Sequence, residues 1–378
     1  LGNGAPTNGL RCRRGPRSNS DHGRDGAYPR RITLHMNSPE RVFTTLEGRQ
    51  ADRVPLMELT IDPGIVQQIL PGGDLFDLIE HLDLDVVPIG IMLDRRPVEW
   101  VDREKRIFRD KWGALQRLTT EVMPIPWKPA RIETEADLDS YVGPDGNDEY
   151  FLEMTRQCVA RFKDKKAICF VGEEVFAVQQ YLRGGMENLM VDYATRPAFA
   201  KRLAKVGVEY YVELYRRVIA EGVDIILLGD DYAWKMGPFM SPRHFEEIIL
   251  PGFRTVVQEI RRAGAYCIKH TDGDIWKIMD MMAGTGLHAF GPLEPLPSMD
   301  LAAIKAHLGG KIAVVGNIDV DLLCRGTTDE VVAATKHLLN TASVGGGHIM
   351  SSGNSIISAV RPENFLALVE TTKRYGVY

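Results

Sequence analysis

The sequence predicts an α/β fold, a (β/α)8 barrel of the TIM type with an inserted β-hairpin after the second strand. Eight short apolar runs recur along the chain, and most of them are followed by a helical pattern. Continuous apolar strands that alternate with helices are typical of a parallel sheet. Eight such units favour a closed barrel over an open sheet. No Gly-x-Gly-x-x-Gly follows the first run, which argues against a dinucleotide-binding domain.

Composition and charge narrow the class of protein. The chain has 378 residues, of which 44% are hydrophobic and 26% charged, enough for one large barrel or two smaller domains. A net charge of −5 offers no general attraction to nucleic acid or to an anionic membrane. No apolar run is long enough for a transmembrane helix, and five scattered cysteines without a Cys-x-x-Cys predict reduced thiols in a cytoplasmic protein.

The first segment differs from the rest. Residues 1–35 hold seven Arg against two Asp and show no hydrophobic period, so we expect a disordered basic extension. A transit peptide is a weaker alternative, because an amphipathic apolar face is missing. A single barrel domain is expected over residues 36–378.

The first half of the predicted barrel runs from Ser38, expected to cap a helix with Pro39 at its first position. Residues 99–128 alternate β-type side chains with charges and predict the inserted hairpin. Strands are expected at 54–60, 85–91 and 167–173, and helices at 41–47, 75–82, 134–142, 148–163, 174–183, 185–192 and 196–221.

The second half repeats the strand–helix unit. Gly345–Gly347 is interpreted as a turn before the last strand, with a phosphate cradle as the less favoured alternative. Strands are expected at 223–231, 266–272, 287–290, 312–316 and 348–352, and helices at 241–263, 299–308, 327–343 and 361–374.

Polar side chains follow the apolar strands at their carboxyl ends, where a barrel places its chemistry. They are Glu58, Glu173, Asp230, Asp231, His270, Asp272, Glu294, Asn317, Asp319, Ser352 and Asn354. His270 and Asp272 share one face of an extended segment, and imidazole with carboxylates can hold a divalent cation. Alternatively, His270 bonds a backbone group and the aspartates cap the next helix. The adjacent Asp230 and Asp231 could share a proton or neutralise a cationic substrate.

Several segments together resemble the uroporphyrinogen decarboxylase superfamily, which contains the haem-pathway decarboxylase and corrinoid-dependent methyltransferases. They are Leu228-Gly229-Asp230-Asp231-Tyr232-Ala233, Met240-Ser241-Pro242-Arg243-His244-Phe245, Ile249-Leu250-Pro251, Lys269-His270-Thr271-Asp272-Gly273-Asp274-Ile275, Val315-Gly316-Asn317-Ile318-Asp319 and Arg361-Pro362-Glu363-Asn364. The resemblance runs from about residue 38 to the end, and it implies a (β/α)8 barrel.

The pattern favours the methyltransferase branch. The decarboxylases carry an Arg-Gln-Ala-Gly-Arg stretch near the first strand, which clamps the substrate's carboxylates. This sequence has Glu58 and Asp62 there, and with Asp230 and Asp231 these acids would repel a porphyrinogen.

The metal ligands of that branch are only partly present. Its methyltransferases typically bind zinc through His-x-Cys on one strand and a Cys on the last strand. His270 matches the histidine, whereas Asp272 and Asn354 stand in the places of the two cysteines, so zinc is uncertain.

The resemblance implies a demethylase that passes a methyl group from a methoxylated or methylated small molecule to a Co(I) corrinoid (cobalamin). No Asp-x-His-x-x-Gly is present, so the corrinoid would come from a partner protein. A homodimer is compatible with this interpretation. Uroporphyrinogen decarboxylase and a non-catalytic corrinoid or small-molecule binding barrel are the alternatives. The expected catalytic residues are His270, Asp272, Asp230, Asp231 and Glu173, with His270 and Asp272 as metal ligands, and the expected substrate-binding residues are Glu58, Tyr232, Asn317, Ser352 and Asn354.

Overall fold

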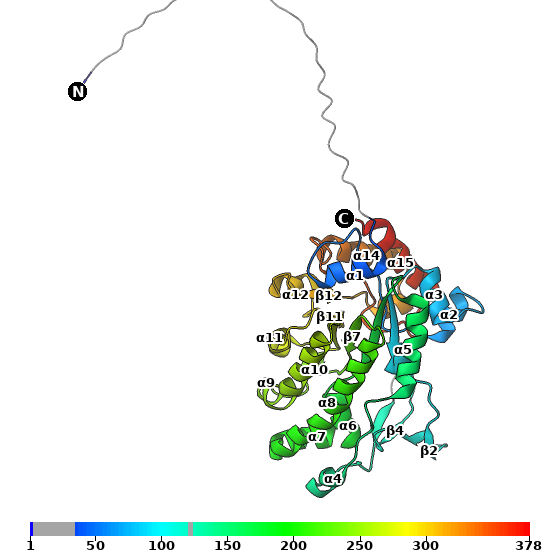
Figure 1. The fold of residues 1–378 in the computed structure, drawn as a ribbon. Helices are drawn as coiled ribbons and strands as arrows, with labels where there is room; N and C mark the ends of the chain where they lie inside the picture. The colour runs from blue at the N-terminus through cyan, green and yellow to red at the C-terminus, as the bar shows by residue number, and fades with distance from the viewer. Residues whose placement is uncertain (3–34, 120–123) are drawn as a thin grey trace, which may run out of the picture. The chain divides into compact units, whose positions relative to one another are not determined.

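The computed structural model describes residues 1–2, 35–119 and 124–378 (Figure 1). The chain separates into two units, Leu1–Leu34 and His35–Tyr378, and the second carries the described fold. The predicted disorder of residues 1–35 therefore falls almost entirely outside the described residues.

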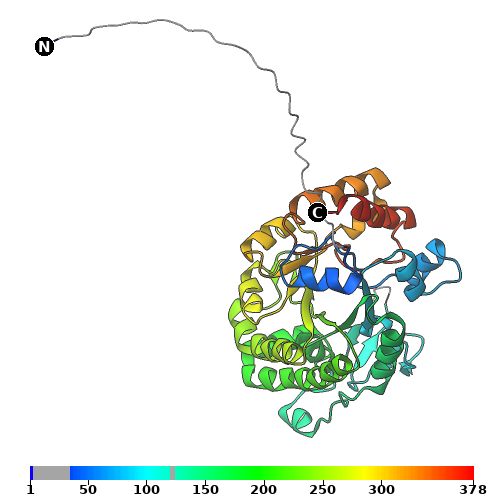
Figure 2. The same ribbon diagram turned by 45° about the horizontal axis from the view of Figure 1, so that its top comes forward.

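A parallel sheet forms the centre of the second unit, with helices on its outer side (Figures 1 and 2). Its strand order is β1-β6-β7-β10-β11-β12-β13, which follows the order along the chain. The strands are β1 (Val86–Gly90), β6 (Ala167–Gly172), β7 (Ile225–Leu228), β10 (Tyr266–Thr271), β11 (Ala289–Leu293), β12 (Ala313–Val315) and β13 (His348–Ile349). Each position coincides with a predicted strand.

The predicted first strand, 54–60, closes the ring of strands through a few backbone hydrogen bonds instead of a full strand ladder. Leu56 forms a parallel bridge with Met350, and Met57 N donates to Met350 O at 3.0 Å. On the other side, Asp85 N, directly before β1, donates to Leu56 O at 2.9 Å. The segment is not a full strand because Pro55 has no N–H and Leu56 N donates to the Asp85 carboxylate at 2.9 Å. With this eighth position the (β/α)8 fold class is confirmed.

Helices follow the strands in the order that the sequence predicts. The main ones are α1 (Ser38–Leu46), α3 (Leu75–His81), α4 (Glu135–Ser140), α5 (Glu149–Phe162), α6 (Phe176–Leu182), α7 (Met186–Thr195), α8 (Pro197–Ala220), α10 (Leu250–Arg262), α11 (Trp276–Ala283), α12 (Leu301–His307), α14 (Thr328–Thr341) and α15 (Pro362–Tyr375). The short helices α2 (Pro63–Ile69) and α13 (Val320–Arg325) were not predicted. None of the helices in the described part of the chain combines the length and apolarity that a bilayer crossing requires.

Two helix predictions need correction. The N-cap of α1 is Asn37, in a capping box with Glu40, whereas the Ser38 hydroxyl donates to Asp85 Oδ1 at 2.8 Å. The predicted helix 241–263 is divided into α9 (Pro242–His244), a π-helical turn (Phe245–Ile249) and α10. Pro251 explains the π turn, since it offers no N–H to the carbonyl four residues earlier.

The inserted element is larger than the predicted hairpin. Four antiparallel strands, in the order β2-β3-β4-β5, form a separate sheet. They are β2 (Glu99–Asp102), β3 (Ile107–Arg109), β4 (Leu115–Arg117) and β5 (Ile125–Trp127). Strands of three or four residues are too short for their alternation to separate them in the sequence.

Alternation along the barrel strands divides the buried side chains into two sets. Ile225 and Leu227 pack inside the ring of strands, whereas Ile226 and Leu228 pack between the sheet and the helices. The same division places Ile268 inside and Cys267 outside on β10. Residues just beyond each strand end continue this alternation. Those with the inward-facing parity lie at the mouth, and those with the other parity lie toward the helices.

Candidate active site

Three predicted residues meet at the mouth of the barrel. Asp231 follows β7, and His270 and Asp272 lie at the end of β10, the neighbouring strand. Their potential ligand atoms lie within 4.8 Å of one another. His270 Nε2 is 3.8 Å from Asp231 Oδ1 and 4.0 Å from Asp272 Oδ1.

A hydrogen bond to a backbone carbonyl fixes the orientation of His270. Its Nδ1 lies 2.7 Å from the carbonyl oxygen of Pro292 at the end of β11, and only 8% of the side chain is exposed. Because a carbonyl can only accept, Nδ1 carries a proton and Nε2 faces the carboxylates of Asp231 and Asp272.

Only one of the two carboxylate oxygens of Asp272 has a hydrogen-bond partner among the described residues. Asn354 Nδ2 donates to its Oδ2 at 2.8 Å, while Oδ1 is buried and has no hydrogen-bond partner among the described residues. Burial raises the pKa of Asp272 to about 6, His270 opposes that shift, and the neighbouring Asp231 and Glu294 carboxylates reinforce it. An unpaired buried acceptor is costly and calls for a partner from outside the chain.

These atoms fit a divalent cation. The set offers one imidazole nitrogen and two carboxylate oxygens, a donor set that zinc and other divalent metals accept. A histidine that ligates a metal usually donates its other N–H to a carbonyl or carboxylate, as His270 does to Pro292. The orphaned Asp272 Oδ1 points to the same conclusion.

The turn after β10 depends on Gly273. Its φ is +85°, and a Cβ there would lie 2.4 Å from the carbonyl carbon of Ala233 in β8 (Ala233–Trp234). Gly273 N donates to Glu294 Oε2 at 3.0 Å. The close approach keeps the hairpin of β8 and β9 (Gly237–Pro238), which was not predicted, beside the cluster.

Asp230 lies outside the mouth cluster, although it is adjacent to Asp231 in the sequence. Its carboxylate accepts backbone N–H bonds from Glu174 at 3.2 Å, Val175 at 2.8 Å and Ala177 at 3.2 Å, and it thereby caps the start of α6. Asp231 has the opposite parity and is half exposed. The idea that the two share a proton is wrong, and a direct catalytic part for Asp230 stays a prediction.

Tyr232 belongs to a buried network behind the mouth. Its hydroxyl donates to Glu174 Oε1 at 2.8 Å, and the same carboxylate pairs with the fully buried Lys269. Burial raises the pKa of Glu174 to about 8, Asp230 adds to the shift and Lys269 opposes it. Glu174 and Lys269 were not predicted as site residues. Both have the helix-facing parity of their strands.

Glu58 and Ser352 meet where the barrel closes. Ser352 Oγ donates to Glu58 Oε2 at 2.6 Å and Ser352 N donates to Oε1 at 3.0 Å. Burial raises the pKa of Glu58 to about 7 against these hydrogen bonds. This contact joins the closing segment to the chain after β13, and a role in substrate binding stays a prediction.

Glu173 and Asn317 lie at other strand ends. Glu173 accepts hydrogen bonds from the hydroxyls of Tyr181 and Tyr211, the latter at 2.6 Å. Burial and the charge of Asp230 raise its pKa to about 7. Asn317 follows β12 and is buried. Neither belongs to the cluster of Asp231, His270 and Asp272.

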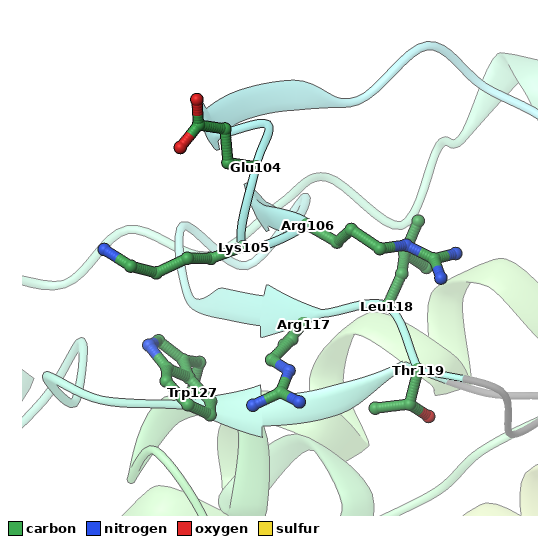
Figure 3. A pocket seen from close by; sticks show the side chains of 7 residues that line it. All are labelled: Glu104, Lys105, Arg106, Arg117, Leu118, Thr119 and Trp127. Atoms are coloured by element: carbon green, nitrogen blue, oxygen red, sulfur yellow. The ribbon is translucent and has the colours of Figure 1, made fainter.

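A cavity of about 550 Å³ lies on the inserted sheet, apart from the mouth cluster. Lys105, Arg106, Arg117 and Trp127 are among the residues that line it, and Figure 3 shows Arg117 beside Trp127 and Arg106 extending toward Leu118. The Arg117 guanidinium lies 4.9 Å from the centre of the Trp127 ring. None of the sequence-predicted site residues lines this cavity.

The fold is similar to that of a solved structure described as a methyltransferase from Methanosarcina mazei. The TM-score is 0.69 at 17% sequence identity, over 90% of this chain and 99% of that one. At this identity the likeness shows the fold alone.

Sequence relatives carry the name uroporphyrinogen decarboxylase. The protein from Legionella pneumophila subsp. pneumophila is 26% identical over 181 residues, 47% of this chain and 48% of that protein. The chain therefore spans about half the length of that relative. The protein from Pelodictyon phaeoclathratiforme is 25% identical over 259 residues, 64% of this chain and 70% of that protein.

A family model settles the membership. The model for uroporphyrinogen decarboxylase matches residues 116–375, well over half of the chain. The matched range contains Asp231, His270, Asp272 and Asn354, the residues that build the mouth cluster. The chain belongs to the uroporphyrinogen decarboxylase family.

Proposed function

We propose that the protein transfers a methyl group from a small methoxylated or methylated molecule to the reduced cobalt of an external corrinoid. One observation carries this proposal, the convergence of His270 Nε2 with the oxygens of Asp231 and Asp272 within 4.8 Å at the mouth. The methyltransferase described for Methanosarcina mazei shares the fold. The corrinoid is a second substrate in this scheme, supplied by a partner protein.

The chemistry needs help at the leaving atom. When the methyl carbon departs, the oxygen keeps the bonding electron pair, and an unprotonated alkoxide or phenoxide leaves poorly. Asp272 Oδ1 lies 4.0 Å from His270 Nε2, so a leaving oxygen bound between them could take a proton from Asp272. Asp231, half exposed beside them, positions the donor.

A divalent cation would be held by His270, Asp231 and Asp272, with Asn354 orienting Asp272. Such an ion supplies Lewis-acid polarisation of the leaving oxygen. The protein's own part is to fix the imidazole through Pro292 and to keep the carboxylate oxygens converged.

The test is the visible spectrum of cob(I)alamin mixed with the protein and a panel of methoxyaromatics and methylamines. We expect one donor to generate the methylcobalamin spectrum, and His270→Ala to lower the rate at least a hundredfold. The control is His307→Ala, which changes a half-exposed histidine of α12 that pairs with Asp280 of α11, and this variant should keep full activity. Unchanged turnover in His270→Ala would remove the cluster from the mechanism.

Porphyrinogen decarboxylation is the second candidate, because the sequence relatives bear that name. The structure reduces the repulsion that the acidic side chains would exert on a porphyrinogen. Glu58 and Asp230 are buried and Asp62 caps α2, so of the four acids only Asp231 is open to the mouth. Consumption of uroporphyrinogen, with no methyl transfer from any donor, would favour the decarboxylase, and neither activity would favour a binding barrel.

A further inference from the structure

Asp231 is half exposed, yet the backbone on both sides of it is held by the neighbouring strand. The carbonyl oxygen of Asp230, which precedes it, accepts a hydrogen bond from Lys269 Nζ at 2.7 Å. The N–H group of Tyr232, which follows it, donates to Thr271 Oγ1 at 2.9 Å. Both partners belong to β10, the strand that supplies the histidine of the mouth cluster. The two peptide units that join at the Cα atom of Asp231 are therefore fixed relative to that strand.

The alternation of side chains along β10 explains this arrangement. Lys269 and Thr271 are buried and have the helix-facing parity, whereas His270, between them, has the inward-facing parity and lies at the mouth. The helix-facing pair bonds the backbone after β7, and this leaves the side chain of Asp231 at the mouth. A third hydrogen bond holds that side chain, because Asp272 N donates to Asp231 Oδ1 at 2.8 Å. The same oxygen lies 3.8 Å from His270 Nε2.

The lysine in this arrangement belongs to a buried ion pair. Lys269 and Glu174 pair with each other, and both side chains are fully buried. The ammonium group also lies 4.3 Å from the centre of the Tyr232 ring. Replacing a buried ion pair by apolar side chains often leaves stability unchanged, so stability alone does not account for this pair. What the ammonium group does supply is a charged hydrogen-bond donor to the carbonyl oxygen of Asp230.

Asp230 is also held from the opposite direction, by a helix. Its carboxylate accepts N–H bonds at the start of α6, among them the bond from Val175 N at 2.8 Å. The carbonyl oxygen and the carboxylate of this residue are thus bonded to two different elements, β10 and α6. Moving the residue would break buried hydrogen bonds, which is costly. Asp231 therefore keeps a fixed backbone position, although its own side chain is open to solvent.

The cation site described above needs such support at Asp231 in particular. His270 is only 8% exposed, and Asp272 Oδ1 is buried without a hydrogen-bond partner among the described residues. Asp231 is the exposed member of the three. An exposed side chain that must be ordered when a ligand binds costs free energy at that step. The bonds to the flanking peptides reduce this cost, because they fix the direction in which the side chain leaves the backbone.

We propose that Lys269 and Thr271 are positioning residues, which hold Asp231 opposite His270 so that these two side chains and Asp272 bind a divalent cation. Lys269 and Thr271 themselves contact neither the cation nor a substrate. The inference rests on the cation site of the proposed function and does not require methyl transfer. Removing a group that orients a metal ligand typically lowers metal affinity by about 10- to 100-fold.

Titration of the metal-free full chain with Co²⁺, followed by the visible ligand-field absorption of the bound ion, tests the inference. Thr271→Val has a similar volume and lacks the oxygen that accepts the Tyr232 N–H group, so we expect about tenfold weaker binding. Thr271→Ser loses volume and keeps that oxygen, so it should bind Co²⁺ as tightly as the unchanged protein. A role in packing alone predicts the reverse order, because Thr271 is fully buried.

Thr335→Val is the matched control for the loss of a buried hydroxyl. Thr335 is fully buried in α14, and its hydroxyl donates to Val331 O at 2.8 Å, within the same helix. This variant should keep full affinity for Co²⁺. His270→Ala should abolish the absorption of the bound ion, which would place the ion at the mouth.

A second change tests the bond from Lys269. Lys269→Met combined with Glu174→Gln removes that bond without leaving an unpaired buried charge, and it should also weaken Co²⁺ binding about tenfold. The two Thr271 variants decide the matter if this double variant does not fold.

Four results would overturn the inference. They are full affinity in Thr271→Val or in the folded double variant, equal losses in Thr271→Val and Thr271→Ser, Co²⁺ absorption that survives in His270→Ala, and no Co²⁺ binding by the unchanged protein. Methyl transfer without Co²⁺ binding would end this inference and leave the proposed function standing. Co²⁺ binding that depends on Thr271 as described, with no methyl transfer from any donor, would do the opposite.

Discussion

At the scale of the residue, burial controls the protonation of Glu58 more than its hydrogen bonds do. Burial raises its pKa to about 7 from an ordinary value of 4.5, although Ser351 and Ser352 donate to its carboxylate. The folded protein therefore holds a proton on Glu58 at pH values where the unfolded chain has released it. The free energy of unfolding must fall as pH rises through that window.

Glu58→Gln tests this reasoning. Between pH of about 4.5 and about 7, Glu58 should cost the unchanged protein about 3 kcal/mol of stability, and the glutamine should remove that part of the slope. Urea unfolding at a series of pH values measures the difference. Glu246→Gln, an exposed change in the π-helical turn, should leave the slope as it is. Identical slopes for Glu58→Gln and the unchanged protein would show that Glu58 ionises normally.

At the scale of the element, strand parity divides neighbours that look equivalent in the sequence. Asp230 and Asp231 are adjacent acids after β7, yet the first faces the helix layer and caps α6 while the second faces the mouth. The sequence predicted the strands, the pair of His270 and Asp272, and Asp231 among the polar strand ends, because apolar runs and polar strand ends are local signals. It did not predict which acids would be used for capping, since that depends on the neighbouring helix.

The same limit explains the other differences at this scale. The antiparallel sheet was predicted as one hairpin because its strands have three or four residues. Asn354 could be placed beside Asp272 only through the family resemblance, since 82 residues separate them.

A pair of substitutions checks the division between the two acids. Asp230→Ala would leave the N–H groups that start α6 buried without an acceptor, so we expect a loss of about 3 kcal/mol in unfolding free energy. Asp231→Ala removes a half-exposed carboxylate and should cost about 1 kcal/mol or less while it abolishes turnover. Denaturant unfolding with activity on the same samples separates the effects. Equal stability losses for the two variants would contradict the assignment.

At the scale of the whole molecule, the buried carboxylate of Asp85 connects the elements that close the barrel. Asp85, fully buried at the start of β1, accepts hydrogen bonds from Ser38 at 2.8 Å, Arg41 at 2.6 Å and Arg53 at 2.9 Å. It also accepts from Leu56 N, in the segment that bridges β1 and β13. One side chain thus connects the first helix, the closing segment and the first full strand.

Asp85→Asn should therefore loosen the ring at its seam. The amide cannot balance two guanidinium groups, and the loss of one partner from a buried ion pair costs about 4 kcal/mol. We expect that loss in urea unfolding, and faster hydrogen exchange at Met57 and Met350, whose N–H groups form the seam. Asp83→Asn is the matched control, because its side chain is 60% exposed and its φ of 43° suits asparagine, so it should cost about 1 kcal/mol or less. If Asp85→Asn instead left exchange at the seam unchanged while lowering stability throughout, Asp85 would support the core in general and would not hold the barrel closed.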